Sequence, residues 1–433
     1  MDYSLLVIIG LLIGLLLLGS PVIFAIGFAG LAYFFVEPGM MSMLPVYAHK
    51  IFTGMDNFIW LSIPLFIMAG EIMGSIGMTD RLLGFSRLLV GRYRGGLAYV
   101  NVVASMLFGG VSGSALADIS ALGPVEIAMM KKDGYRADFS TALTISSAVQ
   151  GPIIPPSIPF IIFSSLTQTS VAGLFLAGAI PGILLGLSMM LVVFYVARRD
   201  KFPANPIKNL NPRMVLHIVL EATWALLMPV IIIGGITTGI FTATEAAAVS
   251  VFYALLVGFV AYRNLSLKQL WQIADRTVRT SASIFLIVAF ATVISWILAN
   301  ERLPSELGAL IEKLDIPVWA LLLLINVFFL INGLWIGDSV QLLLFAPLFT
   351  PLLAGMGVDP IHFGVIMVMN VMIGLLTPPY GMALYLGATV SGEPLGAIVR
   401  QTLPFLGACL VVLMLVTYIP AISLTLPHLF GFK

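Results

Sequence analysis

Long apolar runs separated by short polar connections fill the chain from end to end. A helix needs about 20 apolar residues to cross a bilayer, and nine runs reach that length. The runs are continuous rather than alternating, which favours membrane helices over the strands of a β-barrel. We predict full spans over residues 4–36, 57–77, 139–165, 171–197, 217–240, 243–262, 280–299, 361–390 and 402–426.

Two further apolar regions, at about 95–130 and about 317–356, are expected to enter and leave the membrane on the same side. Basic loops flank the first region, and the positive-inside rule places both in the cytoplasm. The second follows an acidic loop, 300–315, and ends at GMGVDPIH, which holds no lysine or arginine, so both its ends are predicted outside. An arm of about 15–18 helical residues measures roughly 25 Å, so each region is predicted to be a re-entrant hairpin. The basic residues are Arg81, Arg87, Arg92 and Arg94 before the first hairpin and Lys131, Lys132 and Arg136 after it.

Each of the two hairpin regions is followed by a Pro-Pro pair, and the distance from hairpin to proline pair is similar in both. Pro155 and Pro378 open Pro-Pro pairs inside apolar spans and lie 223 positions apart. The same offset relates the spans that begin at 57 and 280. We therefore predict an all-α polytopic protein with inverted-topology repeats, each with one hairpin and one interrupted helix (139–165 and 361–390). The first repeat is assigned to 1–216, span 217–240 links the two, and the second repeat is assigned to 243–433.

Interrupted helices expose backbone groups at membrane depth, where half-helix N-termini favour anions and freed carbonyls favour cations. Hydroxyl, amide and carboxylate oxygens near such breaks suit Na⁺. Asp118 is expected either to partner the first hairpin tip or to shape its second arm. The predicted ion-site residues are Ser112, Gly113, Ser114 and Pro152 for the first site, and Asn332, Gly333, Asp338, Thr377 and Pro378 for the second. The predicted substrate-binding residues are Ser114, Gln150, Ser157, Thr377 and Tyr380.

Composition and charge narrow the possible functions. The chain is 60% hydrophobic and only 9% charged, and its single cysteine, Cys409, excludes an internal disulfide. No lysine or arginine lies in the middle of a predicted span, although Arg302 at a span edge stays available. A transported anion would then be held by helix ends, hydroxyls and co-bound cations. The apolar run after MDYS has no basic region before it, so it is interpreted as a retained span.

Enzymatic alternatives have little support in the sequence. Gly110-Val111-Ser112-Gly113 is similar to the GxSG of rhomboid proteases, but only His362 lies near a hairpin region, and it lies at the rim. GLWIGD lacks the GxGD spacing of aspartyl intramembrane proteases, and HExxH, P-loop and GxGxxG motifs are absent. A channel would need a continuous pore, which dead-end hairpins do not supply. We therefore expect a transporter rather than an enzyme.

The stretches FGGVSGSALADISALG, QGPIIPPSIP and GLLTPPYG resemble the large membrane (M) subunit of tripartite ATP-independent periplasmic (TRAP) transporters. LLLLGSPVIFAIG, IPLFIMAGEIM and RGGLAYVNVVASMLFGG fit the same family, so the resemblance runs nearly end to end. It implies the ion-transporter-superfamily fold, a small four-helix membrane subunit as a separate chain, and a soluble periplasmic substrate-binding protein. It also implies import across the bacterial inner membrane, driven by two or more Na⁺, of a carboxylate such as sialic acid or a C4-dicarboxylate.

These features lead to the hypothesis of an elevator mechanism. The hairpins and the interrupted spans would move as one unit past a scaffold formed by the outer spans and the small subunit. The N terminus is expected in the cytoplasm and the C terminus in the periplasm. An uncharged polar cavity would favour sialic acid. Two alternatives stay open: protons could couple through Asp338 or Asp118, or the chain could be a stand-alone dicarboxylate/Na⁺ symporter that needs no receptor.

Overall fold

The computed structural model describes residues 3–202 and 211–432, and these form helices and connections without a strand. Seven helices among them are long and apolar enough to cross a membrane, and one bent pair adds an eighth crossing. The outer helices are α1 (Tyr3–Leu17), α2 (Val22–Val36), η1 (Met40–Met43), α3 (Leu44–Met55), η2 (Phe58–Leu61), α4 (Ser62–Ser75), α5 (Met78–Val90), α12 (Pro212–Thr237), α13 (Ala243–Leu256), η4 (Val257–Ala261), α14 (Leu267–Asn300) and α15 (Leu303–Lys313). The all-helical membrane fold predicted from the sequence is therefore confirmed.

The predicted single span over 4–36 is wrong. The structure has two 15-residue helices there, α1 and α2, which pack against each other. Gly19 adopts a positive φ of 81°, and Pro21 lacks the N–H that would continue a helix, so the chain turns back between them. A cytoplasmic N terminus followed from a single crossing. The side on which the N terminus lies therefore stays a prediction.

Two other predicted spans have different ends in the structure. Helix α14 begins at Leu267 rather than at 280, so residues before the predicted span are also helical. The last span, predicted at 402–426, is α20 (Leu395–Tyr418) followed by the short α21 (Ala421–Leu429). Pro420 explains this end, because a proline disfavours helical backbone in the residue before it.

The first re-entrant hairpin consists of α6 (Gly96–Ser112), α7 (Ala115–Ala121) and α8 (Gly123–Lys132). Its two flanks meet at Phe202, just after α11 (Val171–Arg199). Arg94 Nε donates to the carbonyl oxygen of Phe202 at 3.1 Å, and the rings of Tyr135 and Phe202 lie 4.6 Å apart. Both ends of the hairpin therefore lie at the C-terminal end of α11, as the loop charges predicted.

The second hairpin consists of α16 (Val318–Asn332) and α17 (Asp338–Gly355), and its flanks meet at the C-terminal end of α20. The Tyr418 hydroxyl donates to the Trp319 carbonyl at 3.0 Å. His362, just after the hairpin, lies 2.7 Å from the Ser423 hydroxyl. Helices α11 and α20 run antiparallel, because Arg199 at the end of α11 lines the same groove as Arg400 near the start of α20. The two hairpins therefore open at opposite ends of this helix pair.

Each hairpin is followed by an interrupted helix, as predicted. In the first, α9 (Ala137–Ala148) and the short η3 (Gly151–Ile153) are followed after a 40° bend by α10 (Ile158–Thr167). In the second, α18 (Pro360–Gly374) and α19 (Met382–Ser391) are separated by a non-helical stretch. The Pro155–Pro156 and Pro378–Pro379 bonds in these stretches are both cis.

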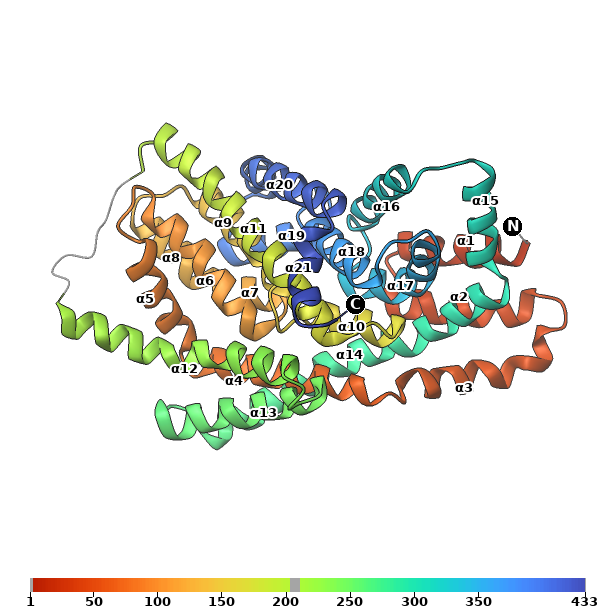
Figure 1. Cartoon of the computed structure of the whole chain (residues 1–433), viewed down its shortest axis with the longest axis horizontal. Coiled ribbons are helices and arrows are strands. Elements are labelled where there is room, and N and C mark those ends of the chain that lie inside the picture. The colour runs from red at the N-terminus through yellow and green to blue at the C-terminus, as the bar shows by residue number, and fades with distance from the viewer. Residues whose placement is uncertain (1–2, 203–210, 433) are drawn as a thin grey trace.

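Element starts repeat along the chain with a nearly constant offset. The pairs α5/α15, α6/α16, α9/α18 and α11/α20 begin 225, 222, 223 and 224 positions apart. Helix α13 begins 221 positions after α2, but α12 begins only 209 positions after α1, so the assignment of 217–240 as the link between the repeats stays a prediction. Figure 1 shows α1 and α2 at one end of the elongated molecule and α12 and α13 at the other, with α14 between them.

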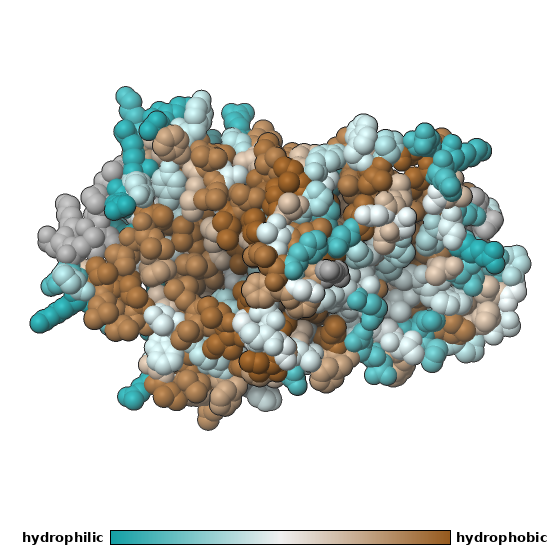
Figure 2. Space-filling view, in the orientation of Figure 1, coloured by the Kyte–Doolittle hydropathy of each residue, from teal (hydrophilic) through white to brown (hydrophobic). Residues whose placement is uncertain are grey.

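The outer surface has the polarity of a protein that faces lipid. Figure 2 shows a broad apolar surface across much of one face, with hydrophilic side chains gathered toward the two ends. Leu187, Leu191 and Phe194 on α11 are among the exposed large apolar side chains. Apolar surface of this extent is expected where hydrocarbon rather than water is the solvent.

Candidate functional site

A cavity of about 610 Å³ lies where the first hairpin tip, α10 and the start of α17 face two outer helices. Ser112, Gly113 and Ser114 line it from the tip, and Asp338 lines it from the second hairpin. The opposite wall comes from α4 and α14, whose polar lining residues are Glu71, Ser75, Arg276 and Thr280. The cavity thus joins the first hairpin tip, the start of α10 and the start of α17 to the outer helices.

The first hairpin tip is shaped by its glycine. Gly113 has a φ of 61°, a conformation that side chains disfavour, and a Cβ there would meet the Pro156 carbonyl oxygen at 2.9 Å. Ser114 caps α7, because its hydroxyl accepts the Ala117 N–H at 3.4 Å. The Ser112 hydroxyl accepts the Ser114 N–H at 3.5 Å. The tip is therefore pressed against the backbone of the first helix break.

Pairs of glycines join each hairpin to its own helix break. A Cβ on Gly109 would lie 2.2 Å from the Gly151 Cα, and a Cβ on Gly333 would lie 2.6 Å from the Gly374 Cα. Only glycine allows two backbones to approach so closely. The hairpin tips and the breaks are consequently held together in both repeats, as an ion site between them would need.

Two of the predicted substrate residues lie behind the tip rather than in the cavity. Gln150 and Ser157 are completely buried. Gln150 Nε2 donates to the Val102 carbonyl at 2.9 Å. The Ser157 hydroxyl donates to the Pro152 carbonyl and accepts the Phe160 N–H at 3.2 Å, which caps α10. These polar groups hold the broken helix in shape, and their contact with a substrate stays a prediction.

Of the residues predicted for the second ion site, only one lines the cavity. Asp338 reaches the cavity, whereas the others do not line it. Asn332 Nδ2 donates to the Phe328 carbonyl at 2.8 Å, and the Thr377 hydroxyl donates to the Ile373 carbonyl at 3.2 Å, so both bond to their own helices. Pro378 lies in the second break beside them, and the side chain of Tyr380 is 63% exposed. The sites around Gly333 and around Ser112 are therefore separate.

Asp118, on the second arm of the first hairpin, is the most unusual buried group near the tip. It is 1% exposed, and neither carboxylate oxygen makes a hydrogen bond of standard geometry among the described residues; the Ser105 hydroxyl is a donor beside it. A Cβ on Gly151 would lie 4.0 Å from Asp118 Oδ2, so the carboxylate points toward the first break. A buried carboxylate without a well-formed hydrogen bond is costly, and a bound cation would remove that cost. This observation fits an oxygen-lined Na⁺ site.

Sequence reasoning missed a polar network beside Asp118. Asn101 Nδ2 lies 2.7 Å from Glu126 Oε2 and 2.7 Å from the Thr144 hydroxyl, and the Ser147 hydroxyl donates to Asn101 Oδ1 at 2.8 Å. Glu126 is completely buried. A carboxylate in the apolar part of a re-entrant region was the available signal. Over the described residues, no three His, Cys, Asp or Glu side chains gather as transition metals would require.

Sequence reasoning also missed the charged wall of the cavity. Arg276 Nε lies 2.9 Å from Glu71 Oε2, and both side chains line the cavity. Hydropathy places the span at 280–299, so Arg276 lies outside the predicted span. The stretch Ser266–Gln269 carried the missing signal, since it forms a capping box in which each side chain bonds the other residue's N–H. Arg276 is therefore a basic side chain in the cavity, at a position just outside the predicted span.

Two opposed re-entrant hairpins, two interrupted helices and a polar cavity at their tips define a secondary transporter fold. The crystallised YdaH transporter of Alcanivorax borkumensis shares it, with a TM-score of 0.61, 15% identity, and coverage of 88% of this chain and 89% of that one. At that identity the likeness concerns the fold alone.

The family model for the DctM component of tripartite ATP-independent periplasmic transporters matches residues 9–422, and the chain belongs to this family. It is 41% identical over 418 residues to the sialic acid TRAP transporter large permease protein SiaM of Vibrio cholerae, covering 96% of this chain and 97% of that protein. It is 40% identical over 384 residues to the C4-dicarboxylate TRAP transporter large permease protein DctM of Pseudomonas aeruginosa, covering 89% and 90%. The chain is therefore a multi-pass TRAP permease and not an enzyme.

Proposed function

We propose that this chain is the large membrane subunit of a Na⁺-coupled importer of an organic carboxylate in the bacterial inner membrane. The family implies two partners, a small four-helix membrane subunit and a periplasmic substrate-binding protein. The observation that carries the proposal is the cavity in which a glycine-rich hairpin tip, Asp338 and the Arg276–Glu71 pair meet. A neutral substrate would not need this concentration of charge at membrane depth.

Two groups of oxygen donors would hold Na⁺. The first consists of Ser112, Gly113 and Ser114 at the tip, the break around Pro152, and the buried carboxylate of Asp118. The second consists of Asn332, Gly333, Asp338, Thr377 and Pro378. Bound Na⁺ would supply positive charge beside the cavity, and the occupancy of the anion site would then depend on Na⁺ by linkage.

The substrate proposal is limited to an organic carboxylate. Arg276 provides a guanidinium that can bind a carboxylate in a fork geometry, and the Ser114 hydroxyl lies on the opposite wall. The preference for sialic acid rested on an uncharged cavity, and Glu71 and Arg276 remove that reason. Relatives named for sialic acid and for C4-dicarboxylates are almost equally similar to this chain, so the proposal includes both classes.

Transport by an elevator movement is supported by where the close contacts lie. Helices α6, α9, α11 and α20 pack on one another, so α11 and α20 would move with the hairpins rather than stay in the scaffold. Across the boundary to the scaffold, a Cβ on Gly70 of α4 would lie 3.2 Å from the Ser112 Cα. Gly110 faces Pro229 of α12 in the same way. Contacts through small groups let one surface slide along another.

Uptake by reconstituted vesicles tests the proposal. The chain and its small membrane subunit are inserted together, and the binding protein is supplied with labelled sialic acid or a labelled C4-dicarboxylate. An inward Na⁺ gradient should drive accumulation of one of them. Accumulation driven by a pH gradient without Na⁺ would overturn Na⁺ coupling, and accumulation without the binding protein would instead identify a stand-alone symporter.

A further inference from the structure

A groove of about 640 Å³ lies on the surface of the molecule between α11 and α20, and it shares no lining residue with the cavity at the first hairpin tip. Its walls are apolar along most of their length, with Leu191 and Val192 from α11 and Phe405, Ala408 and Val411 from α20. Leu191 is 69% exposed and Val411 is 60% exposed, so the groove opens to the surroundings rather than to the protein interior. It also lies where Figure 2 shows mainly apolar surface.

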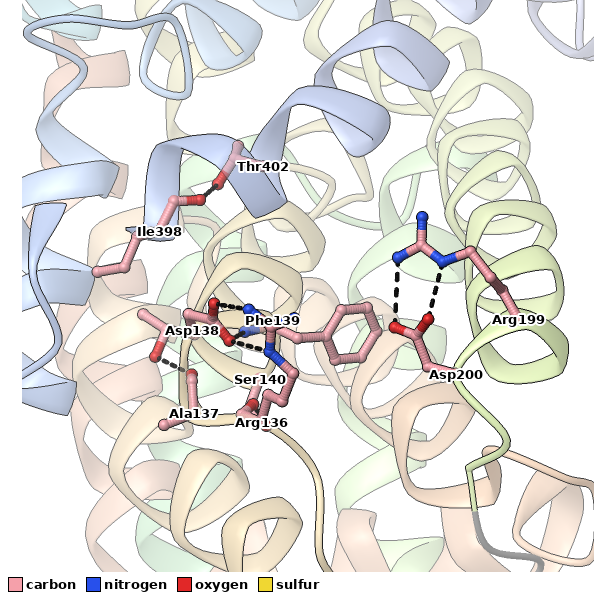
Figure 3. Close-up of polar contacts among 10 residues, drawn as sticks. Arg136, Ala137, Asp138, Phe139, Ser140, Arg199, Asp200, Ile398 and Thr402 are labelled. Atoms are coloured by element: carbon pink, nitrogen blue, oxygen red, sulfur yellow. Dashed lines mark hydrogen bonds and ion pairs between the residues drawn. The ribbon is translucent and has the colours of Figure 1, made fainter. Parts of the chain in front are cut away.

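One end of the groove is surrounded by charged groups. Figure 3 shows Phe139 between two ion pairs, Arg136–Asp138 on one side and Arg199–Asp200 on the other. Arg199 Nε lies 2.8 Å from Asp200 Oδ1. The hydrogen bond from Arg199 holds the pKa of the Asp200 carboxyl below its ordinary value, so this carboxylate stays charged. Each pair is therefore nearly neutral as a unit.

Arg400 is the charge that these pairs leave uncompensated. Its side chain lines the groove, and it makes no ion pair or hydrogen bond with the part of the chain that the structure describes. Lys131 lies 3.8 Å from Glu393, which places the start of α20 beside the base of the first hairpin. Loop charges assign that base to the cytoplasmic side. The mouth of the groove is thus basic and lies at the level of the cytoplasmic lipid headgroups.

We propose that this groove binds one anionic phospholipid, with its phosphate at Arg400 and an acyl chain along the apolar walls of α11 and α20. A basic mouth attracts anionic headgroups, which are enriched in the cytoplasmic leaflet. A soluble anion would not need the apolar walls, and an apolar helix of another protein would leave Arg400 without a counter-charge. The combination therefore selects an amphiphile with a negative head.

Native mass spectrometry of the purified protein, together with its small subunit, tests this inference. The protein is titrated with dioleoyl phosphatidylglycerol and with dioleoyl phosphatidylcholine, which differ only in the headgroup. The first phosphatidylglycerol should bind more tightly than phosphatidylcholine. Arg400→Gln should weaken that first binding by about fivefold and leave phosphatidylcholine binding unchanged. Arg400→Lys should keep most of the preference, because it keeps the charge.

Two further variants complete the design. Arg213→Gln removes an exposed arginine at the start of α12, outside the groove, and should not change the titration. Ala408→Trp fills the groove and should abolish the first phosphatidylglycerol binding, provided that the melting temperature matches the parent protein. Equal binding of the two lipids, an Arg400→Gln protein that binds like the parent, or a well-folded Ala408→Trp protein that keeps its preference would each overturn the proposal. Competition by inorganic phosphate would also overturn it, because it would indicate a site for a free anion.

Discussion

At the scale of single residues, the proposed Na⁺ coupling depends on two carboxylates in the hairpins. Asp118 is buried without a well-formed hydrogen bond, and Asp338 begins α17 at the edge of the cavity. Burial keeps water away from Asp118, so its carboxylate needs a cation or a donor. Asp338 lies in the cavity and accepts a hydrogen bond from the Ser339 hydroxyl at 3.4 Å, which leaves its other oxygen available to a cation. The two residues lie in different repeats, which is the arrangement expected for two ion sites related by the inverted repeat.

Na⁺ should stabilise the parent protein but not variants that lack these carboxylates. At Na⁺ concentrations roughly a hundredfold above Kd, each occupied site adds about 2.7 kcal/mol. Asp118→Asn and Asp338→Asn should each lose most of one such increment, and Asp338→Asn should abolish Na⁺-driven uptake. Melting curves in NaCl and in KCl at equal ionic strength measure this. Asp275→Asn is the control, since Asp275 pairs with Arg279 on an exposed part of helix α14. If either hairpin variant responds to Na⁺ like the parent, its carboxylate does not bind the ion.

Replacing Arg276 should weaken substrate binding more than replacing its neighbour Arg279. The two arginines lie one turn apart on α14 and each pairs with a carboxylate, but only Arg276 lines the cavity. Arg276→Gln should raise the KM for the carboxylate about tenfold, the effect of losing a charged hydrogen bond. Arg279→Gln should change it little. Initial uptake rates over a range of substrate concentrations compare them, and equal KM values for the two variants would exclude Arg276 from the site.

The residues predicted from the sequence and those missed differ in the kind of signal they leave. Ser112, Gly113, Ser114 and Asp338 interrupt apolar runs, so a polar tip could be inferred from composition alone. Arg276 lies on a helical extension that hydropathy treats as a loop. Gln150 and Tyr380 were assigned by their nearness in sequence to a break. Side-chain direction, which sequence does not show there, turns Gln150 toward α6 and leaves Tyr380 exposed.

At the scale of elements, the hairpins are held by contacts between backbones. The two glycine pairs, Gly109–Gly151 and Gly333–Gly374, leave no room for a methyl group. Gly234, on α12, has open space where a Cβ would be, and it provides the matched control.

Alanine at these contacts should separate a hairpin from its break. Gly109→Ala and Gly333→Ala should each destabilise the protein by about 1–3 kcal/mol, because backbone atoms cannot move aside as a flexible side chain can. Both variants should also lose uptake, since the ion donors would be displaced. Gly234→Ala should be close to the parent in melting temperature and in uptake. A Gly109→Ala protein with parental stability and activity would show that the close approach is unnecessary.

The hairpins and breaks could be predicted because charge and proline leave clear marks in a membrane protein. Basic residues on both sides of 95–130 place both ends of the first hairpin on the same side of the membrane, and the Pro-Pro pairs indicate where the helices are interrupted. The helix pair α1–α2 could not be recognised in the same way. A run with Gly19 and Pro21 near its middle has the same hydropathy whether it forms one kinked span or two helices that pack together.

At the scale of the whole molecule, that helix pair changes how the repeats are counted. The pair α1–α2 belongs with the first repeat and α13 lies at the matching offset from α2, while the role of 217–240 as a linking span stays a prediction. The inverted architecture itself was predictable from the 223-residue offset between the proline pairs. The boundary between the two repeats was not predictable, because the offset does not show where the first repeat begins.

The central claim is that the hairpin unit moves against the scaffold, and a reversible cross-link tests it most directly. The Cβ of a residue at Gly110 would lie 3.7 Å from the Pro229 Cβ, within the range of a disulfide, and the only native cysteine, Cys409, is completely buried. The double variant Gly110→Cys/Pro229→Cys should lose Na⁺-driven uptake when oxidised and regain it on reduction, while each single variant is unaffected by oxidation. Parental uptake by the fully cross-linked protein would contradict the account.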